Sequence, residues 1–268
     1  MPITSTIVEE GPSHGRGKGH TSHGNGKGLG HEKHGDNAMA DGIFTIRLQG
    51  IDVDNPTSTN QVSAPTTLAD GTTLLTEVRE GSLSIVDGPG AGVDGALRLE
   101  TDSNNGRLRL TDVYDSDQQF TLGELDELSF NYYIESSDRT DVIPVIRLLV
   151  DADGDLSTTA DRGELVFEYA YQGLPATTQD AWQTADLAGD DWVAWQRANG
   201  TNLDQVVNMT ELSDWADADG FTPAGGITFN EDSLVLGWSV ALGSGNGAAV
   251  AYIDDLQVGG VTYDFAVL

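Results

Sequence analysis

The segment ELSFNYYIES, residues 127–136, alternates large apolar side chains with polar residues or a further tyrosine. Successive side chains of a β-strand point to opposite faces of a sheet, so a period of two predicts a strand with one buried face. The side chains expected on that buried face are Leu128, Phe130, Tyr132 and Ile134. The segment therefore indicates a β-sheet that covers a core on one side.

The same period recurs on both sides of this segment. GALRLET (95–101) and GRLRLTD (106–112) place leucines on one face and charged side chains on the other. Further strands are expected at ELVFEYAY (164–171), SLVLGWSVAL (233–242), AYIDDLQV (251–258) and GVTYDF (260–265). In SLVLGWSVAL, the residues expected on one face are Leu234, Leu236, Trp238, Val240 and Leu242. In ELVFEYAY, the corresponding residues are Leu165, Phe167, Tyr169 and Tyr171.

DVIPVIRLLV, residues 141–150, is apolar on both faces, which predicts a central strand, with Pro144 marking a bulge or an edge segment. A short helix is expected at 210–218, with Thr210 as its N-cap. No helical segments of about 10–15 residues alternate with the strands, so a parallel α/β sheet is excluded. The pattern predicts an all-β fold, a two-sheet antiparallel β-sandwich or jelly roll with one short helix.

Residues 1–40 have a different composition, rich in glycine, histidine and lysine, and they hold all five histidines of the chain. Such a segment cannot bury a core, so a disordered tail is expected at 1–40 and a single sandwich domain at 41–268. Two His-x-x-His pairs, at 20/23 and 31/34, offer loose transition-metal ligands, but a flexible solubilising tail is the favoured interpretation.

The net charge of −30 arises in residues 41–268, which contain nine arginines but no lysine, histidine or cysteine. So acidic a surface repels nucleic acid and anionic membranes, and it favours a salty or calcium-rich extracellular setting. The composition excludes disulfides, thiolate chemistry and histidine-based catalysis from this domain. No apolar run is long enough for a membrane span, so no membrane insertion is expected.

LLVDADGDLSTTADRGELVFEY, residues 148–169, carries aspartates at alternate positions between two apolar runs. Calcium binds six to eight oxygen ligands, and alternate aspartates let one tight loop direct several carboxylates at one ion. The expected calcium ligands are Asp151, Asp153, Asp155, Ser157, Asp161 and Glu164. The loop is not an EF-hand, because Leu156 and Arg162 stand where that motif needs glycine and glutamate. Aspartate and glycine also favour plain turns, which is the alternative interpretation.

Catalytic motifs are weak throughout the chain. GELDELSF, residues 123–130, resembles in part the acidic strand of laminarinase-type glycoside hydrolases, but Ser129 stands where the second catalytic glutamate is required. Glu124, Asp126 and Glu127 therefore fit a polar turn before the strand better than an active site. No catalytic residues are predicted, and a non-enzymatic role is favoured.

Aromatic rings can stack on sugars, and Trp192 and Trp195 are the expected ligand-binding residues because they lie in a polar, glycine-flanked segment. Their spacing puts them on opposite faces of a strand, so only one of them is expected to be exposed. Trp182 and Trp238 are expected in the core, and Trp215 on the packing face of the short helix.

From about Gly95 onward, the order of GALRLET, LGELDELSFNYYIES, RLLVDADGDLS, GELVFEYAYQG and AYIDDLQVGGVTYDF resembles bacterial secreted β-sandwich domains with a concanavalin-like or carbohydrate-binding-module-like jelly roll. The resemblance implies a fold and an extracellular, surface or matrix setting, but it does not specify an activity. The expected partners are a polysaccharide or cell-surface glycan, or further copies of this chain.

The terminal residues bear on export. The first residues lack the basic and apolar regions of a signal peptide, and the terminal YDFAVL resembles the tails of type I secretion substrates. An extracellular or cell-surface protein, exported by that route, is expected, although these residues can equally just finish the last strand. The leading function is a calcium-stabilised attachment module. The alternatives are a carboxylate-dependent glycoside hydrolase and a self-assembling filament or surface-layer subunit.

Overall fold

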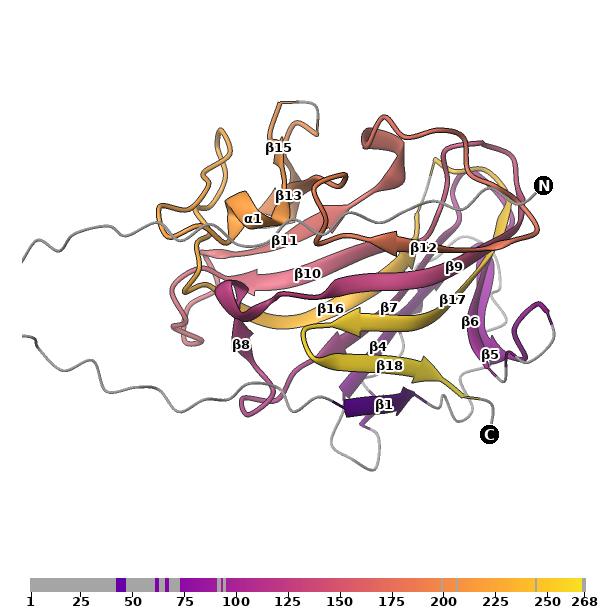
Figure 1. The fold of residues 1–268 in the computed structure, drawn as a ribbon, viewed down its shortest axis with the longest axis horizontal. Helices are drawn as coiled ribbons and strands as arrows, with labels where there is room; N and C mark the ends of the chain where they lie inside the picture. Colours follow the sequence, from indigo (N-terminus) through magenta and orange to yellow (C-terminus); the bar gives the residue numbers. More distant parts are fainter. Residues whose placement is uncertain are drawn as a thin grey trace, which may run out of the picture. The chain divides into compact units, whose positions relative to one another are not determined.

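The computed structural model describes residues 73–266 apart from residues 91, 92, 94, 199, 206 and 244, and also describes the backbone of three short strands, β1 (Gly42–Ile46), β2 (Gln61–Val62) and β3 (Thr66–Thr67). The expected tail at 1–40 lies outside these residues, as do the two His-x-x-His pairs and Val267 and Leu268. The described chain confirms the predicted fold class, since two curled, almost entirely antiparallel sheets pack face to face (Figure 1).

Sheet A is organised around β17 (Ala249–Val258), which pairs along one edge with β9 (Leu128–Ser137). The other edge of β17 is divided between β6 (Ala96–Thr101) in its first half and β18 (Val261–Phe265) in its second half. The outer strands are β5 (Gly81–Val86), β12 (Trp182–Asp186) and β1, which runs parallel to β18. The β17–β18 hairpin confirms the strands expected from AYIDDLQV and GVTYDF.

Sheet B has the strand order β14-β13-β11-β10-β16-β7-β4-β2. Its central strands are β10 (Val145–Asp151), β11 (Arg162–Phe167), β16 (Leu234–Leu242) and β7 (Arg107–Val113). Toward its ends lie β4 (Thr73–Arg79), β13 (Ala194–Ala198), β14 (Thr201–Asn202), β15 (Met209–Thr210) and β3, while the short β8 (Phe120–Thr121) pairs with the start of β16. Short helical turns are η1 (Leu122–Glu124), η2 (Tyr169–Tyr171) and α1 (Leu212–Trp215).

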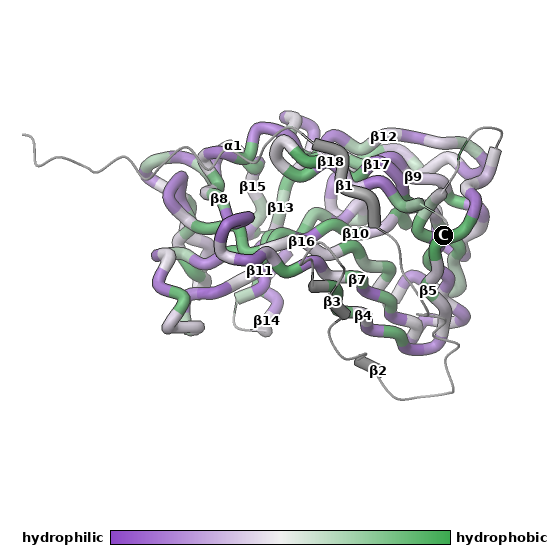
Figure 2. Tube along the Cα trace, turned by 90° about the horizontal axis from the view of Figure 1, so that it is seen from below, coloured by the Kyte–Doolittle hydropathy of each residue, from purple (hydrophilic) through white to green (hydrophobic). Residues whose placement is uncertain are grey.

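The core lies between the inner faces of the two sheets, and apolar and polar positions alternate along many of the strands (Figure 2). The leucines predicted to face inward in β6 and β7 are fully buried, and the four apolar residues of β9 are buried as expected. Trp238 and Trp215 are also fully buried, whereas Trp182 is only half-buried on the outer face of sheet A, so its assignment to the core is wrong. Its indole donates a hydrogen bond to the Pro89 carbonyl (2.7 Å).

β16 departs from simple alternation at Gly237. This residue has φ +146°, and the pairing of β10 with β16 slips there, between Leu149 and Val150. The slip turns Val235 into the core and leaves Leu236 facing the other side of the sheet, where it lines a hollow. The prediction that Leu234 and Leu236 share the buried face of Trp238 is therefore wrong, because a β-bulge inverts the alternation on one side of it.

Three further boundaries differ from the sequence expectation. β10 lies between β11 and β16, as predicted for a central strand, but Pro144 stands just before it rather than at a bulge or an edge. β11 ends at Phe167, so Tyr169 and Tyr171 lie in a 3₁₀ turn instead of continuing the strand. α1 is a single turn whose N-cap is Glu211, not Thr210.

The described part of the chain contains no helix long and apolar enough to span a membrane.

Gly237 should tolerate no side chain. A Cβ added there would lie 2.1 Å from the Asp112 carbonyl oxygen, in a backbone conformation that L-residues rarely adopt. Gly237→Ala is expected to lower the free energy of unfolding by about 2 kcal/mol or more, measured by urea denaturation. Gly243→Ala, at the end of the same strand with open space around the added carbon, is the control and should change stability by less than about 0.5 kcal/mol. Equal effects of the two substitutions would contradict the bulge.

Candidate functional site

The outer face of sheet B, turned away from the core, gathers arginines from strands far apart in the sequence. Arg107 and Arg109 alternate with the buried leucines of β7, so both point outward. Arg147 occupies the equivalent outward position in β10, and Arg197 in β13. Arg79, which pairs with Arg107 across β4 and β7, and Arg162 of β11 lie on the same face, which thus holds six of the nine arginines of residues 41–268.

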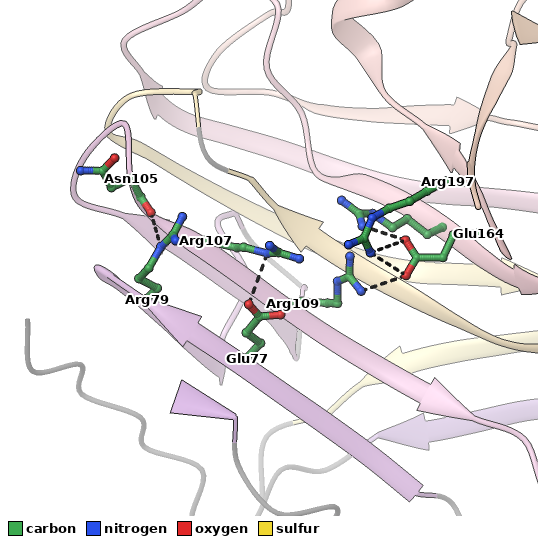
Figure 3. Close-up of polar contacts among 8 residues, drawn as sticks. Glu77, Arg79, Asn105, Arg107, Arg109, Glu164 and Arg197 are labelled. Atoms are coloured by element: carbon green, nitrogen blue, oxygen red, sulfur yellow. Dashed lines mark hydrogen bonds and ion pairs between the residues drawn. The ribbon is translucent and has the colours of Figure 1, made fainter. Parts of the chain in front are cut away.

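Three of these arginines converge on one carboxylate, that of Glu164 in β11 (Figure 3). The Arg147 guanidinium donates to Glu164 Oε2 at 2.9 Å, and that of Arg109 donates to Oε1 at 3.2 Å. Arg197 Nη1 is 3.4 Å and 3.5 Å from the two oxygens. All four side chains are largely covered by their neighbours. One negative charge thus faces three positive charges, which leaves a local excess of two.

Arg107 forms a second, looser pair beside this cluster, with its Nε 3.4 Å from Glu77 Oε1 (Figure 3). Burial lowers the pKa of Arg107, and the neighbouring positive charges of Arg109, Arg197 and Arg79 lower it further, against the opposing effect of Glu77. Burial is the main cause of this shift, and the contributions of Arg109, Arg197 and Arg79 show that three further guanidinium groups lie near Arg107.

Several guanidinium N–H groups in the cluster lack acceptors. Nε and Nη2 of Arg109 and Nε of Arg147 are buried and have no hydrogen-bond partner among the described residues. Each arginine carries five donors in a fixed plane, while a single carboxylate has about four lone pairs to offer. The cluster therefore has more donors than Glu164 can satisfy.

Two adjacent hollows open on this face. The larger, about 550 Å³, is lined mostly by polar groups, including Arg107, Arg147, Arg197, Asn202 and Gln205. The second, about 380 Å³, is lined by apolar residues of β7, β10 and β16 and reaches Thr159 and Arg162. The two hollows share Arg197 and Gly200, so they lie side by side, and we call the pair the sheet-B groove.

Glu168 is the carboxylate that lines the larger hollow. Burial raises its pKa, and the Trp195 indole and the positive charge of Arg139 partly oppose that rise. Glu168 follows the end of β11, four residues beyond Glu164. The strand rise of about 3.3 Å per residue separates the backbones of these two glutamates by about 13 Å.

The acidic loop between β10 and β11 closes around Asp151, whose carboxylate is fully buried. Asp151 accepts a hydrogen bond from Arg162 Nε at 2.7 Å and one from the Gly154 N–H at 2.9 Å. One carboxylate oxygen from each of Asp151, Asp153 and Asp161 lies within 4.8 Å of the other two. Oxygens bound to one calcium ion at 2.3–2.6 Å are separated by similar or shorter distances, so these three residues fit a shared cation.

The remaining predicted ligands do not join this group. Asp155 accepts hydrogen bonds from both the hydroxyl (2.6 Å) and the N–H (3.0 Å) of Ser157. These two residues therefore form a local turn with each other. Glu164 lies within the arginine cluster instead, and we remove it from the ligand set. Asp161 accepts a hydrogen bond from the Thr158 hydroxyl, which is the main reason that its pKa is lowered. The other Asp161 carboxylate oxygen is buried without a hydrogen-bond partner among the described residues.

The two tryptophans predicted to bind ligand lie on opposite faces of the sheet, and neither presents an exposed ring. Trp192 is buried in the main core with its ring against Tyr169, at 5.8 Å between centroids. Trp195 belongs to a small apolar cluster on the outer face of sheet B, with Val145, Val166 and Ala241. It lines the larger hollow but is only 3% exposed, so it supports the groove rather than offering a stacking surface.

The acidic residues before β9 act locally. The Glu124 carboxylate accepts a hydrogen bond from the Thr121 N–H at 2.8 Å and so caps η1. Asp126 and Glu127 are exposed in the turn that leads into β9. This arrangement agrees with the interpretation of GELDELSF as a polar turn.

A third hollow, of about 420 Å³, lies beside sheet A and is lined by Trp182, Asn131 and three aspartates, Asp254, Asp255 and Asp264. Burial, together with repulsion from Asp255 and Asp264, raises the pKa of Asp254 to about 6. Asp255 has φ +48°, at a bulge where β17 loses register with β9. The arrangement crowds like charges at one point of β17.

Asp254 should make stability depend on pH between about 4 and 6. Its pKa is higher in the folded chain than in the unfolded chain, so the folded state holds an extra proton in this window and loses stability as pH rises through it. Asp254→Asn should therefore raise the free energy of unfolding at pH 7.5, by on the order of 1 kcal/mol after allowance for solvent screening, and change little at pH 3.5. Urea denaturation at both pH values measures this. Asp126→Asn, an exposed control, should give no such difference, and a pH-independent effect at Asp254 would contradict the prediction.

No family model and no curated protein matches the sequence. Among solved structures, the chain is similar to the family 11 xylanase from Neocallimastix patriciarum, with 14% sequence identity and a TM-score of 0.26. The match covers 74% of this chain and 94% of the xylanase chain. A likeness at this level carries no argument about activity, and membership of a secreted bacterial family stays a prediction.

Proposed function

We propose that this protein is a non-catalytic, extracellular β-sandwich module that attaches to a surface, matrix or glycan polymer through the sheet-B groove and is stabilised by calcium in the loop between β10 and β11. The observation that carries the proposal is the groove itself. Its two hollows, of about 550 and 380 Å³, have volumes in the usual range of ligand sites, roughly 300–1,000 Å³.

The form of the groove favours a polymer over a small enclosed ligand. Both hollows open to solvent on a sheet face and are adjacent at Arg197 and Gly200, which supports an elongated ligand crossing several strands. Hydrogen-bonding side chains such as Asn202 and Gln205 line the larger hollow, as sugar hydroxyls require. The strongly acidic composition of the domain supports the extracellular setting.

A glycoside hydrolase is the second candidate, because Glu168 combines a groove position with a raised pKa, as a general acid requires. Hydrolysis needs a second carboxyl group about 5 to 9.5 Å away. Arg109 and Arg147 hold the carboxylate of Glu164, whose backbone is about 13 Å away by strand rise, and Arg139 pairs with Asp141, the acid whose charge acts on Glu168. The attachment role therefore has the stronger support.

Calcium at the acidic loop has a specific structural rationale. Asp151, Asp153 and Asp161 bring three carboxylates together with Arg162 as the neighbouring cation, and that arginine is engaged by Asp151. A divalent ion would offset the remaining repulsion and give the buried Asp161 oxygen a partner. Water and backbone carbonyls would complete its coordination. Because the loop joins two central strands of sheet B, an ion there would brace one end of the groove.

Filling the groove should abolish attachment without unfolding the domain. Asn202 is exposed in β14 and lines the larger hollow, so Asn202→Trp should obstruct it and lower affinity for a bound polysaccharide at least tenfold. A glycan array in calcium identifies the polymer, and isothermal titration measures the change. Ser116→Trp, exposed in the turn after β7, adds the same side chain elsewhere and should bind as the wild type does. A wild-type chain that binds no polymer, or that hydrolyses one, would overturn the proposal.

Calcium should raise the melting temperature, since a ligand that binds only the folded state at about 100 times its Kd adds about 2.7 kcal/mol. For a chain of this size that corresponds to roughly 5–10 °C, lost on adding EGTA. Asp161→Asn should abolish the calcium-dependent shift. Asp155→Asn removes the same charge from the same loop but not from the three-carboxylate group, so it should keep most of the shift. Equal shifts in all three proteins would rule out the assigned ligands.

A further inference from the structure

We infer that the sheet-B groove is selective for acidic polysaccharides and binds a carboxylate or sulfate group of the polymer through the guanidinium groups of Arg107, Arg147 and Arg197. This inference rests on the proposed function, in that it assumes the groove to be the attachment site, and it assigns the chemical class of the ligand.

The first support is the charge balance of the groove floor. Arg109, Arg147 and Arg197 share Glu164 alone, while Arg107 shares Glu77. Four positive charges thus face these two carboxylates, and Glu168 is a third acid at the hollow, so positive charge is still in excess on largely covered side chains, where water screens it less than at the open surface. A structural ion-pair network that served stability alone would match its charges more closely, because uncompensated charge at covered positions costs free energy.

The second support is the surplus of donors. Three guanidinium N–H groups, on Arg109 and Arg147, are buried without a partner among the described residues. Leaving such a group unsatisfied costs about 1–3 kcal/mol. These donors show that Glu164 does not exhaust the hydrogen-bonding capacity of the cluster. The three buried groups therefore add positive potential beneath the hollow, while the parts of Arg107, Arg147 and Arg197 that line it can bond a carboxylate or sulfate, each of which presents two oxygens to a guanidinium group.

The third support is access. Arg107, Arg147 and Arg197 all line the larger hollow, and Asn202 and Gln205 line the same space. The charged groups therefore lie where a ligand can reach them, with neutral hydrogen-bonding groups beside them for the uncharged part of a sugar. Arg109 does not line the hollow, so it adds positive electrostatic potential to the site without contacting a bound ligand.

Two features set the limits of this site. Glu168 lines the hollow as well and would repel a bound anion, so it tunes the affinity downward. The net charge of −30 repels polyanions at long range, but salt shortens that range to about 8 Å at 0.15 M and about 3 Å at 1 M. Selectivity for acidic sugars is thus expected at the salt concentrations of a marine or saline setting.

The test compares three oligosaccharides by isothermal titration in 0.5 M NaCl with calcium: trigalacturonate for carboxylates, a sulfated carrageenan tetrasaccharide for sulfates, and maltotetraose as a neutral chain. At least one acidic oligosaccharide should bind at least tenfold more tightly than the neutral one. The preferred acidic chain tells which of the two oxyanions the groove takes.

Substitutions locate the binding to the groove. Arg107→Gln and Arg197→Gln should each weaken acidic binding about 10- to 100-fold, the effect of losing one charged hydrogen bond. Neither should change the affinity for maltotetraose. Glu168→Gln should strengthen acidic binding several-fold because it removes a like charge from the hollow. Arg98→Gln, on the outer face of sheet A, changes the net charge equally and should have no effect. Melting curves establish that each variant is folded.

The outcomes separate this inference from the proposed function. Equal affinity for neutral and acidic chains, blocked by Asn202→Trp, would overturn the acidic selectivity and leave the attachment role standing. Acidic binding that survives both Arg107→Gln and Arg197→Gln would overturn the assigned site. No binding of any polymer by the folded wild-type chain would overturn both.

Discussion

The contact between Trp238 of β16 and Tyr263 of β18 joins the two sheets, with ring centroids 4.9 Å apart and ring planes at 67°. The chain has no cysteine, so apolar packing of this kind has to hold the sandwich closed. Tyr263 also donates a hydrogen bond to the Tyr114 hydroxyl (3.1 Å), and burial raises the pKa of both tyrosines. Because the inner faces are largely committed to this packing, most charged side chains lie on the outer faces and in the loops, with Asp112 beside Tyr263 as an exception.

β16 connects that constraint to the site. Gly237 lets the strand bulge immediately before Trp238, so the tryptophan keeps its place in the core while Leu236 turns outward to line the groove. The two strands that flank β16 are β7 and β10, and in both of them side chains alternate strictly between the two faces of the sheet. Arg109 and Arg147 therefore both point outward, one on each side of β16. The groove is therefore a by-product of how the core is packed, and its arginines are placed by the same period of two that buries the leucines.

Much of the fold could be predicted from the sequence because alternation is a local signal. It identified the buried faces of β6, β7 and β9 and the final hairpin, and it failed where a bulge at Gly237 inverted the pattern. The acidic loop could also be predicted, but which of its carboxylates come together could not. Glu164 is three residues from Asp161 in sequence, but it lies within strand β11. Its side chain therefore points to the outer sheet face, toward Arg147, and away from the loop.

The arginine cluster was missed for a different reason. Its members come from β7, β10, β11 and β13, and only the strand order brings them together. Two features of the sequence pointed toward it: arginine is the only basic residue type in residues 41–268, and it alternates with leucines that are expected to be buried.

The cluster is significant because arginine is scarce in this domain. In a domain with 39 acidic residues and nine arginines, random placement would surround most arginines with carboxylates. Arg98 and Arg139 follow this rule, since each is paired with an acid two residues away. Arg109, Arg147 and Arg197 instead share one glutamate, against the prevailing charge of the chain. A domain of strongly acidic composition therefore has one region where positive charge is in excess, and such a local reversal would let the proposed site bind an anion without attracting anions in general.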